Sequence, residues 1–353
     1  MAVTLKMIAK EAGVSIMAVS GVLNNRGNSK VSAATRARIQ EIARKLDYQP
    51  DYFASATRTG IVKTIGVITS GEDHSSMKIA SEVLCGIQSK CSELGYNVHL
   101  FDTNDLSATF GKIVSHRINK LILVSVNEKI RKEVAELCRK KSLSLVFANG
   151  PAAWGFPGAV HNNFQAMYES IKYLIDQGHR KIGLLCSPHH IYINEQRHLG
   201  YEKALQEAGI TPESSWCSCN CFPDEKRVNC LIRKVKKGEL TAIGTISACW
   251  AADLQRAAVK EGIKIPEELS IVTMGTFTEA LLPFVPCSYS TYDPMEIGTE
   301  CVSLLFRRET SCDGEEENTS FIEGCFTPMA STAPPPRENK FFPTDKKTKR
   351  STK

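Results

Sequence analysis

The segment 14–25, "VSIMAVSGVLNN", has the residue spacing of a helix that packs on one side and presents its other side to a partner. Val19, Val22 and Leu23 fall on one side and predict a buried stripe. The same spacing turns five residues outward: Ile16, Met17, Ser20, Gly21 and Asn24. Ile16 and Met17 offer apolar contact, Gly21 has no side chain, and only Ser20 and Asn24 offer side-chain hydrogen bonds.

Two neighbouring helical patterns position this segment. The first begins after Thr4, a candidate N-cap, and ends at Gly13, which suits a turn that requires a positive φ. Ser15 is a candidate cap for the second helix, and Ser32 for a third that continues to Leu46. Two short helices joined by a tight turn are typical of a helix-turn-helix, whose second helix points its N-terminal end at base edges. A small helical bundle without nucleic acid gives the same pattern.

The net charge of +6 is unevenly placed. Residues 1–60 hold nine basic and four acidic side chains, and residues 335–353 hold seven and two, so each end carries +5. A basic head and tail on an acidic middle favour a polyanionic partner, although solvated surface charge produces the same distribution.

From residue 64 onward, β-rich runs alternate with amphipathic stretches, which predicts parallel sheets with crossover helices. The strands form one sheet or two similar lobes. The expected strands are 64–68, 97–101, 120–126, 143–148, 181–186, 241–247 and 269–274, and the helices include 76–94, 163–177, 194–208 and 251–261. The end of the chain, 335–353, has the composition of a disordered tail.

These residues resemble the lactose/galactose repressor family of bacterial transcription regulators. The resemblance rests on AGVS (12–15), VS (19–20), VLN (22–24), VS (31–32), TR (35–36) and Leu46, Tyr48 and Pro50. It continues through GHRKI (178–182), RHLGY (197–201), IPEELSIV (265–272) and STAPP (331–335), so it covers all but the tail.

The resemblance implies an all-α helix-turn-helix head plus an α/β two-lobed core like that of periplasmic binding proteins. The expected domains are the DNA-binding head 1–49, a hinge 50–63, the effector-binding and dimerisation core 64–334 and a basic disordered tail 335–353. It also implies a homodimer, because such heads read two-fold symmetric, palindromic operators in double-stranded DNA.

Family contacts to DNA phosphates carry over to Thr4, Ser15, Ser20, Asn24, Thr35 and Tyr48. The expected base readers are Ile16, Met17 and position 21, where family members have Arg. Gly21 cannot donate to guanine, which leads to the hypothesis that this head contacts thymine methyl groups and lets the backbone approach closely at Gly21. In the hinge, Asp51 and Thr57 replace the family's Asn and wedging Leu, while Arg58 can still contact the duplex. We therefore expect weaker central kinking of the operator.

The resemblance also implies a small-molecule effector, such as a carbohydrate, bound between the lobes. Arg197 matches the family's effector-binding Arg, and the other expected pocket residues are Ser70, Asn149 and Asp293. Ser247, Ala248 and Gly275 stand where the family has polar groups that hold sugar hydroxyls, which puts a standard hexose in doubt. Trp216, Phe222 and Trp250 are candidates to stack on a ligand, although large aromatic residues are more often core.

Other chemistry has little support in the sequence. The run "CSCNCF" spaces Cys217, Cys219 and Cys221 too closely for a usual zinc site, and we expect the 13 cysteines to be reduced thiols. His189 and His190 are expected in a loop near the cleft or in solvent. No motif proposes a catalytic nucleophile, so we expect no enzyme, metal or cofactor. Without a signal peptide or membrane anchor, a soluble cytoplasmic protein is expected. The competing functions are a DNA-binding protein that ignores ligands and a solute-binding protein with an incidental helical head.

Overall fold

The N-terminal head contains three short helices around one apolar core. The computed structural model describes residues 3–23, 31–48, 62–69, 74–187, 191–218, 225–275, 284–307 and 318–336. The head helices are α1 (Leu5–Ala12), α2 (Ile16–Leu23) and α3 (Ala33–Lys45). Ile8, Val19 and Ile39, one from each helix, are completely buried in this core. The chain forms two compact units, Met1–Lys63 and Thr64–Lys353, which we describe separately.

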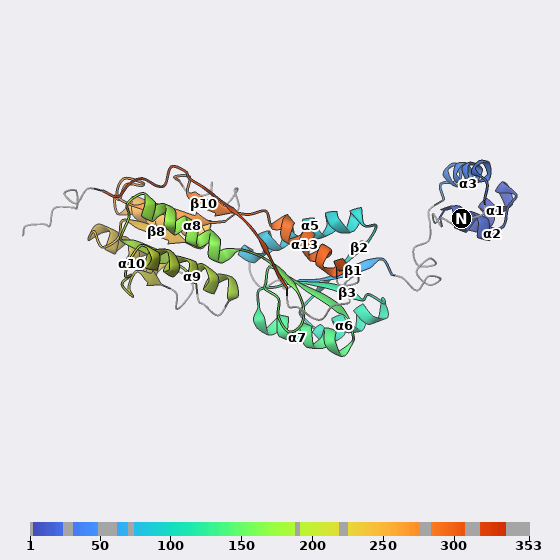
Figure 1. Ribbon diagram of the computed structural model, residues 1–353, viewed down its shortest axis with the longest axis horizontal. Coiled ribbons are helices and arrows are strands. Elements are labelled where there is room, and N and C mark those ends of the chain that lie inside the picture. The colour runs from blue at the N-terminus through green and yellow to red at the C-terminus, as the bar shows by residue number, and fades with distance from the viewer. Residues whose placement is uncertain are drawn as a thin grey trace, which may run out of the picture. The chain divides into compact units, whose positions relative to one another are not determined.

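The larger unit contains two sheets with helices on both faces (Figure 1). The strands of the first sheet are β1 (Thr64–Thr69), β2 (Asn97–Asp102), β3 (Lys120–Val124), β4 (Ser144–Ala148), β5 (Gly158–His161) and β11 (Thr319–Ile322). They lie in the order β11-β5-β4-β3-β1-β2, and all neighbours are parallel. We call this sheet and its helices lobe 1.

Successive side chains along the strands of lobe 1 point into two different cores, one on each face of the sheet. Ile122 and Val124 of β3 face α5 (His74–Glu93) and α13 (Pro294–Arg307). Leu121 and Leu123 face the opposite core, under α6 (Leu106–Ser115) and α7 (Glu128–Lys140). This alternation explains why the strands of a sheet covered on both faces read as continuous apolar runs.

Lobe 2 repeats the arrangement with the second sheet. Its strands are β6 (Ile182–Leu185), β7 (Cys217–Ser218), β8 (Ala242–Thr245), β9 (Ser270–Met274), β10 (Ser288–Thr291) and β12 (Cys325–Thr327). They lie in the order β12-β10-β9-β8-β6-β7, and β12 is antiparallel to β10. One face packs against α8 (Asn163–Asp176) and α9 (Tyr192–Glu207), the other against α10 (Glu225–Lys236) and α11 (Ala248–Lys260).

The seven expected strands and four named helices are all present, with boundaries shifted by a few residues. The two-lobed alternative is confirmed over the single sheet. Among the described residues, no helix combines the length and apolar character needed to cross a membrane.

Candidate nucleic-acid interface and ligand site

The turn between α1 and α2 has the backbone that the sequence predicts. Gly13 has φ 64° and ψ 35°, a left-handed conformation that other residues adopt at a cost. Its N–H donates to the Ala9 carbonyl and ends α1. Ser15 Oγ then accepts a hydrogen bond from the Ala18 N–H at 3.1 Å and caps α2. The Gly13 turn and the Ser15 cap together therefore fix the first turn of α2.

The outward face of α2 is narrower than expected. Ile16 is 48% exposed and Met17 is 85% exposed, both at the N-terminal end of the helix. Ser20 and Gly21 are buried, which corrects the prediction that they face outward. Both are small and flank the buried valines, so packing α2 against α1 and α3 covers them as well. Because Gly21 is buried, a partner cannot approach its backbone closely in this conformation.

The remaining candidate DNA contacts lie around this face or outside the described residues. Thr4 precedes α1 and is exposed, without the side-chain cap expected of it. The Thr35 hydroxyl pairs with Ser32 Oγ at 2.9 Å, and Tyr48 packs half-buried against the head core. Three predicted contacts lie outside the described residues: Asn24, Thr57 and Arg58.

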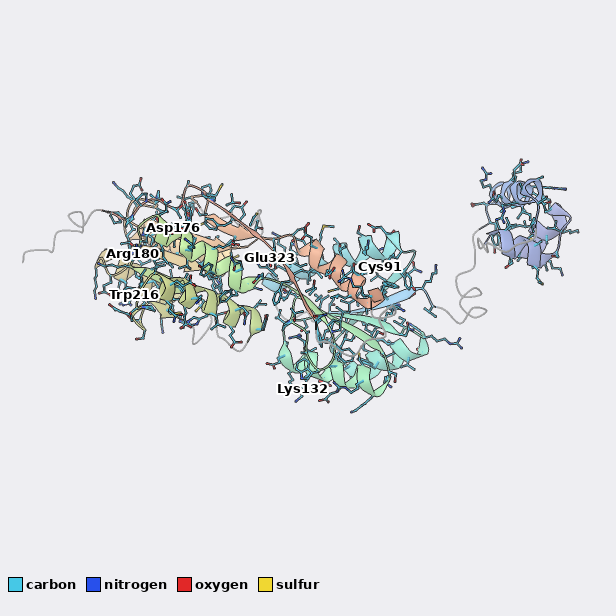
Figure 2. All side chains as sticks on the ribbon, viewed as in Figure 1. Cys91, Lys132, Asp176, Arg180, Trp216 and Glu323 are labelled. Atoms are coloured by element: carbon cyan, nitrogen blue, oxygen red, sulfur yellow. The ribbon has the colours of Figure 1, made fainter. Side chains whose placement is uncertain are left out.

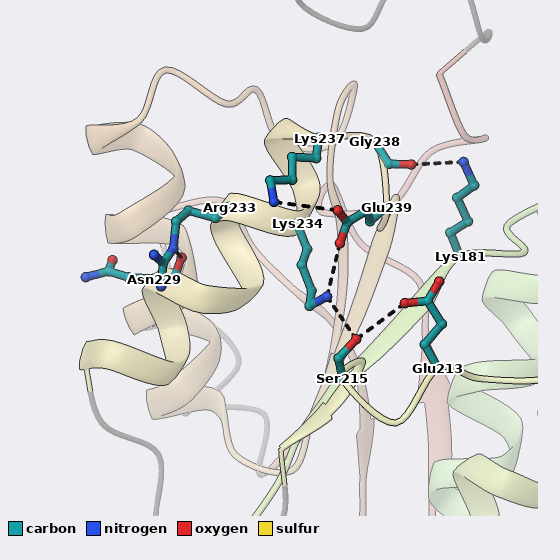
Figure 3. Close-up of polar contacts among 9 residues, drawn as sticks. All are labelled: Lys181, Glu213, Ser215, Asn229, Arg233, Lys234, Lys237, Gly238 and Glu239. Carbon is teal, nitrogen blue, oxygen red and sulfur yellow. Dashed lines mark hydrogen bonds and ion pairs between the residues drawn. The ribbon is translucent and has the colours of Figure 1, made fainter.

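Part of the basic segment 226–237 in lobe 2 is paired with nearby carboxylates of the same lobe. Lys234 Nζ, near the end of α10, donates to Glu239 Oε2 at 3.0 Å and to Ser215 Oγ at 2.9 Å (Figure 3). Lys236 pairs with Glu261 at 2.7 Å. These contacts fasten α10 to the neighbouring loops of its own lobe.

The connections between the lobes fix where a ligand site can lie. The chain leaves lobe 1 at the carboxyl end of β5 and enters lobe 2 at α8, and it leaves lobe 2 at the carboxyl end of β10 to begin α13. Because β5 and β10 are parallel to their inner neighbours, the carboxyl edges of both sheets face the connections. Open α/β sheets bind ligands at this edge.

The three connections are tied together side by side. The Asn162 N–H donates to the Ile322 carbonyl at 2.9 Å, and Asn162 Nδ2 donates to Glu323 Oε1 at 2.9 Å. The third connection is the short segment 323–324 between β11 of lobe 1 and β12 of lobe 2, and it contains Glu323 (Figure 2). His161, at the end of β5, is 1% exposed and stacks on Tyr292 of the second connection. Burial and, to a smaller extent, the nearby Arg197 charge lower the pKa of His161 to about 4.

Arg197 reaches the carboxyl edge of the lobe 2 sheet, as its predicted pocket role requires. It lies on α9, half-buried, and its Nη1 donates to the carbonyl of Ile246, the residue after β8, at 3.0 Å. Its Nε donates to Asn163 Oδ1 at 2.8 Å, and Asn163 in turn donates to the His161 carbonyl. Arg197 is therefore held at the point where the first connection meets lobe 2.

The other predicted pocket residues have different surroundings. Asn149 follows β4 at the carboxyl edge of lobe 1, half-buried, with a left-handed φ of 58°. Asp293 is exposed and caps α13, since its Oδ1 accepts the Met295 N–H at 2.9 Å. Capping leaves that oxygen engaged in the fold and weakens the case for a pocket role. Ser70 lies outside the described residues.

Several residues at these edges were not singled out from the sequence. His161 and Asn163 organise the first connection. Asn194 of α9 donates to Ser187 Oγ at 2.6 Å. Arg131 of α7 is 5% exposed, and Gly150 of the loop after β4 lies directly against its guanidinium. Arg131 carried a sequence signal, because it falls on the buried stripe of α7 with Val134, Ala135 and Cys138.

The aromatic residues and cysteines singled out from the sequence have different environments. Trp216 is buried in the lobe 2 core, labelled in Figure 2, and Trp250 packs half-buried between the two cores of that lobe. Phe222, His189, His190, Cys219 and Cys221 lie outside the described residues. The expectation of reduced thiols is wrong for Cys186, which is disulfide-bonded, whereas eight other described cysteines are free thiols. The described residues contain no cluster of His, Cys, Asp or Glu suited to a metal ion.

Comparisons with known proteins agree with this architecture of a helix-turn-helix head on a two-lobed binding core. Residues 4–51 match the lacI family of bacterial regulatory proteins, and residues 171–332 match the periplasmic binding protein-like domain. The chain is 26% identical over 330 residues to the transcriptional repressor PurR of Haemophilus influenzae, covering 91% of this chain and 95% of that protein. It is 29% identical over 331 residues to PurR of Edwardsiella ictaluri, with 91% and 93% covered.

Among solved structures, the Lac repressor dimer bound to operator and the anti-inducer ONPF aligns with a TM-score of 0.75 at 20% identity, covering 94% of this chain and 100% of that one. The CelR–cellobiose complex aligns with a TM-score of 0.65 at 21% identity, covering 93% and 99%. The protein is thus a DNA-binding transcription regulator by class. Its helix-turn-helix head belongs to the lacI family of bacterial regulatory proteins, and its core contains a periplasmic binding protein-like domain.

Proposed function

We propose that this regulator binds a palindromic operator as a homodimer in the cytoplasm and that a small molecule bound between the two lobes changes its affinity for that operator. The observation that carries the proposal is the fixed first turn of α2, which projects Ile16 and Met17 from a head held by the Gly13 turn. Apolar side chains in this position suit contact with thymine methyl groups in a major groove. Thr4, Ser15 and Thr35 then supply phosphate contacts, which set register without reading sequence.

Exposed apolar residues support the homodimer. Leu100 is 56% exposed on β2, the edge strand of lobe 1, and Val114 on α6 is 48% exposed. In lobe 2, Val259 is 66% exposed and Phe284 is 72% exposed. Uncovered apolar side chains on an edge strand and on both lobes favour burial against a second copy.

The effector role rests on Arg197, which is held at the carboxyl edge of lobe 2 by Asn163 and the Ile246 carbonyl. Asn149 stands at the matching edge of lobe 1. Ser247 and Ala248 begin α11 where the family places polar sugar contacts, so we infer that the effector is not a standard hexose. Closure of the lobes on a ligand would alter the spacing of the two heads, and the ligand shifts this equilibrium by its differential affinity for the two states.

Selection of bound DNA from a random duplex pool, with and without candidate ligands, tests the proposal. We expect an inverted repeat whose half-sites contain A·T pairs opposite Ile16 and Met17. Recovery of no inverted repeat over scrambled DNA at moderate ionic strength would overturn operator binding. An operator that is selected identically in every ligand, combined with no ligand-induced thermal stabilisation, would favour a DNA-binding protein without an effector.

A further inference from the structure

Arg131 is a buried cation without a buried anion. Its side chain enters lobe 1 from α7 and is 5% exposed. Among the described residues, no carboxylate comes within ion-pair distance of its guanidinium. Burying a charge is costly unless it is paired and fully hydrogen-bonded.

The contacts that Arg131 does make leave the guanidinium incompletely satisfied. Its carbon lies 4.4 Å from the centroid of the Phe147 ring and 5.6 Å from that of Trp154, so aromatic faces cover it. Nη2 donates to the Pro151 carbonyl. Nε is buried and has no hydrogen-bond partner. A guanidinium with an open donor fits a carboxylate or phosphate oxygen.

The surroundings place Arg131 at the carboxyl edge that faces lobe 2. Phe147 lies near the end of β4, and Asn149 and Gly150 follow it, with Gly150 packed on the guanidinium. Tyr192, the first residue of α9 in lobe 2, has its pKa raised by burial and lowered in part by the Arg131 charge, so the two groups lie within electrostatic range of each other. Burial lowers the pKa of Arg131 itself to about 10, and the charges of Glu128, which is exposed on the same helix, and of Tyr192 offset only part of this effect.

We propose that Arg131 is an anion-recognition residue and that the effector of this regulator carries a carboxylate or phosphate group, which binds Arg131 from the interlobe side. The inference rests on the proposed effector site between the lobes. In that site, Arg131 supplies the lobe 1 contact to the charged group, and Arg197 supplies the lobe 2 contact. Opening of the lobes admits the anion, and closure brings Tyr192 back beside it.

The test is thermal unfolding of the full-length protein in sodium phosphate, sodium acetate and sodium chloride at matched ionic strength and pH 7. We expect phosphate or acetate at up to 100 mM to raise the unfolding midpoint by at least about 2 °C over chloride, because a ligand that binds only the folded state stabilises it. Which of the two anions acts distinguishes a phosphate from a carboxylate ligand. An equal midpoint in all three salts overturns the proposal.

Two variants separate anion binding from loop anchoring. R131M removes the charge while keeping an unbranched side chain, and it should abolish the salt-specific rise. R139M is the matched control, because Arg139 also lies on α7 and bonds the same loop, donating to the Trp154 carbonyl at 2.7 Å, yet is exposed. R139M should keep the rise, and a rise retained in R131M or lost equally in both would contradict the proposal.

Failure of this inference is distinguishable from failure of the proposed function. The head reads the duplex sequence, so R131M should select the same sequence motif as the unaltered protein, whatever its affinity. If neutral sugars stabilise the protein and anions do not, Arg131 is a structural residue and the effector site stands. If neither stabilises it, the anion proposal fails, and effector binding between the lobes is then decided by the operator selection with candidate ligands.

Discussion

The imidazole of His161 stacks on the phenol ring of Tyr292, with centroids 4.0 Å apart and planes inclined by 10°. The two residues belong to different connections between the lobes, and His161 Nδ1 lies 3.0 Å from the Ile322 carbonyl at the start of the third. One ring therefore touches all three connections. Any relative rotation of the lobes must turn about this contact or break it.

The buried His161 should make stability depend on pH. Its pKa in the folded protein is about 4, lowered mainly by burial, whereas an unfolded His titrates near 6.5. The unfolded chain thus binds the proton first, so this contribution is complete above about pH 6.5 and is lost as the pH falls toward 4. Between pH 7.5 and 5 the loss should be about 2 kcal/mol.

Urea denaturation of the unaltered protein and of H161F at both pH values measures this loss. H161F keeps an aromatic ring against Tyr292 but cannot titrate, so its stability should fall less on acidification. His179, whose pKa is also lowered by burial, remains in both proteins and cancels in the comparison. Identical pH dependence in the two proteins would refute the role of His161.

The crossing of α5 and α13 should not tolerate a side chain at Gly298. A Cβ there would collide with the Val83 carbonyl oxygen, and one at Gly86 would collide with the backbone of Met295. G298A should therefore destabilise lobe 1 by about 1–3 kcal/mol, the usual cost of overpacking. G111A on α6 is the control, because a Cβ meets nothing within 4 Å there and should stabilise by up to about 1 kcal/mol. Equal midpoints for G298A and the unaltered protein would show that the two helices can move apart freely.

Alkylation of the folded protein should label the exposed cysteines faster than the buried ones. Cys85, Cys230, Cys249 and Cys325 are exposed free thiols. Burial raises the pKa to about 11 for Cys91 and Cys287, to about 12 for Cys138, and still further for Cys301. Since the thiolate is the reactive form, iodoacetamide at pH 8 should label the first group at least about tenfold faster. Peptide mass spectrometry reads the order, and early labelling of Cys301 would be inconsistent with this packing.

Met17 should contribute to operator affinity, in contrast to another exposed methionine of the head. Met17 is 85% exposed on the recognition face, and M17A should weaken binding to the selected operator about fivefold through lost apolar contact. Met7 on α1 is 44% exposed and away from the first turn of α2, so M7A should change affinity less than about twofold. Fluorescence anisotropy measures both, and equal effects would argue against α2 as the reading element.

The sequence predicts well the elements whose signal is local. β3 and β4 are continuous apolar runs, and the Gly13 turn follows from one glycine and one serine cap. The short strands β5 and β11 have only four residues each and become strands by pairing Gly158 with Thr319, which no local pattern encodes. Their positions define the connections, so the geometry at the interlobe edge could not be derived before the fold was known.

Motifs located candidate residues at definite positions, and their binding roles stay predictions, whereas spacing alone misjudged exposure where packing decided it. Arg197 was found through its motif and reaches the expected edge. Ser20 and Gly21 were placed outward from spacing alone, but an eight-residue helix packed on two others buries more than one narrow stripe. Arg131 reads as one of several bases in α7, and only the structure shows that its Nε is buried without a hydrogen-bond partner among the described residues.

Because the chain passes three times between the lobes, each lobe is completed only late in synthesis. Lobe 1 obtains α13 and its edge strand β11 only after nearly all of lobe 2 has been made, and lobe 2 obtains β12 last of all. Until residue 322 has emerged from the ribosome, the outer edge of β5 has no neighbour and exposes its peptide groups. Neither lobe can mature ahead of the other, so a nascent chain interrupted at Thr291 holds two incomplete folding units rather than one finished half.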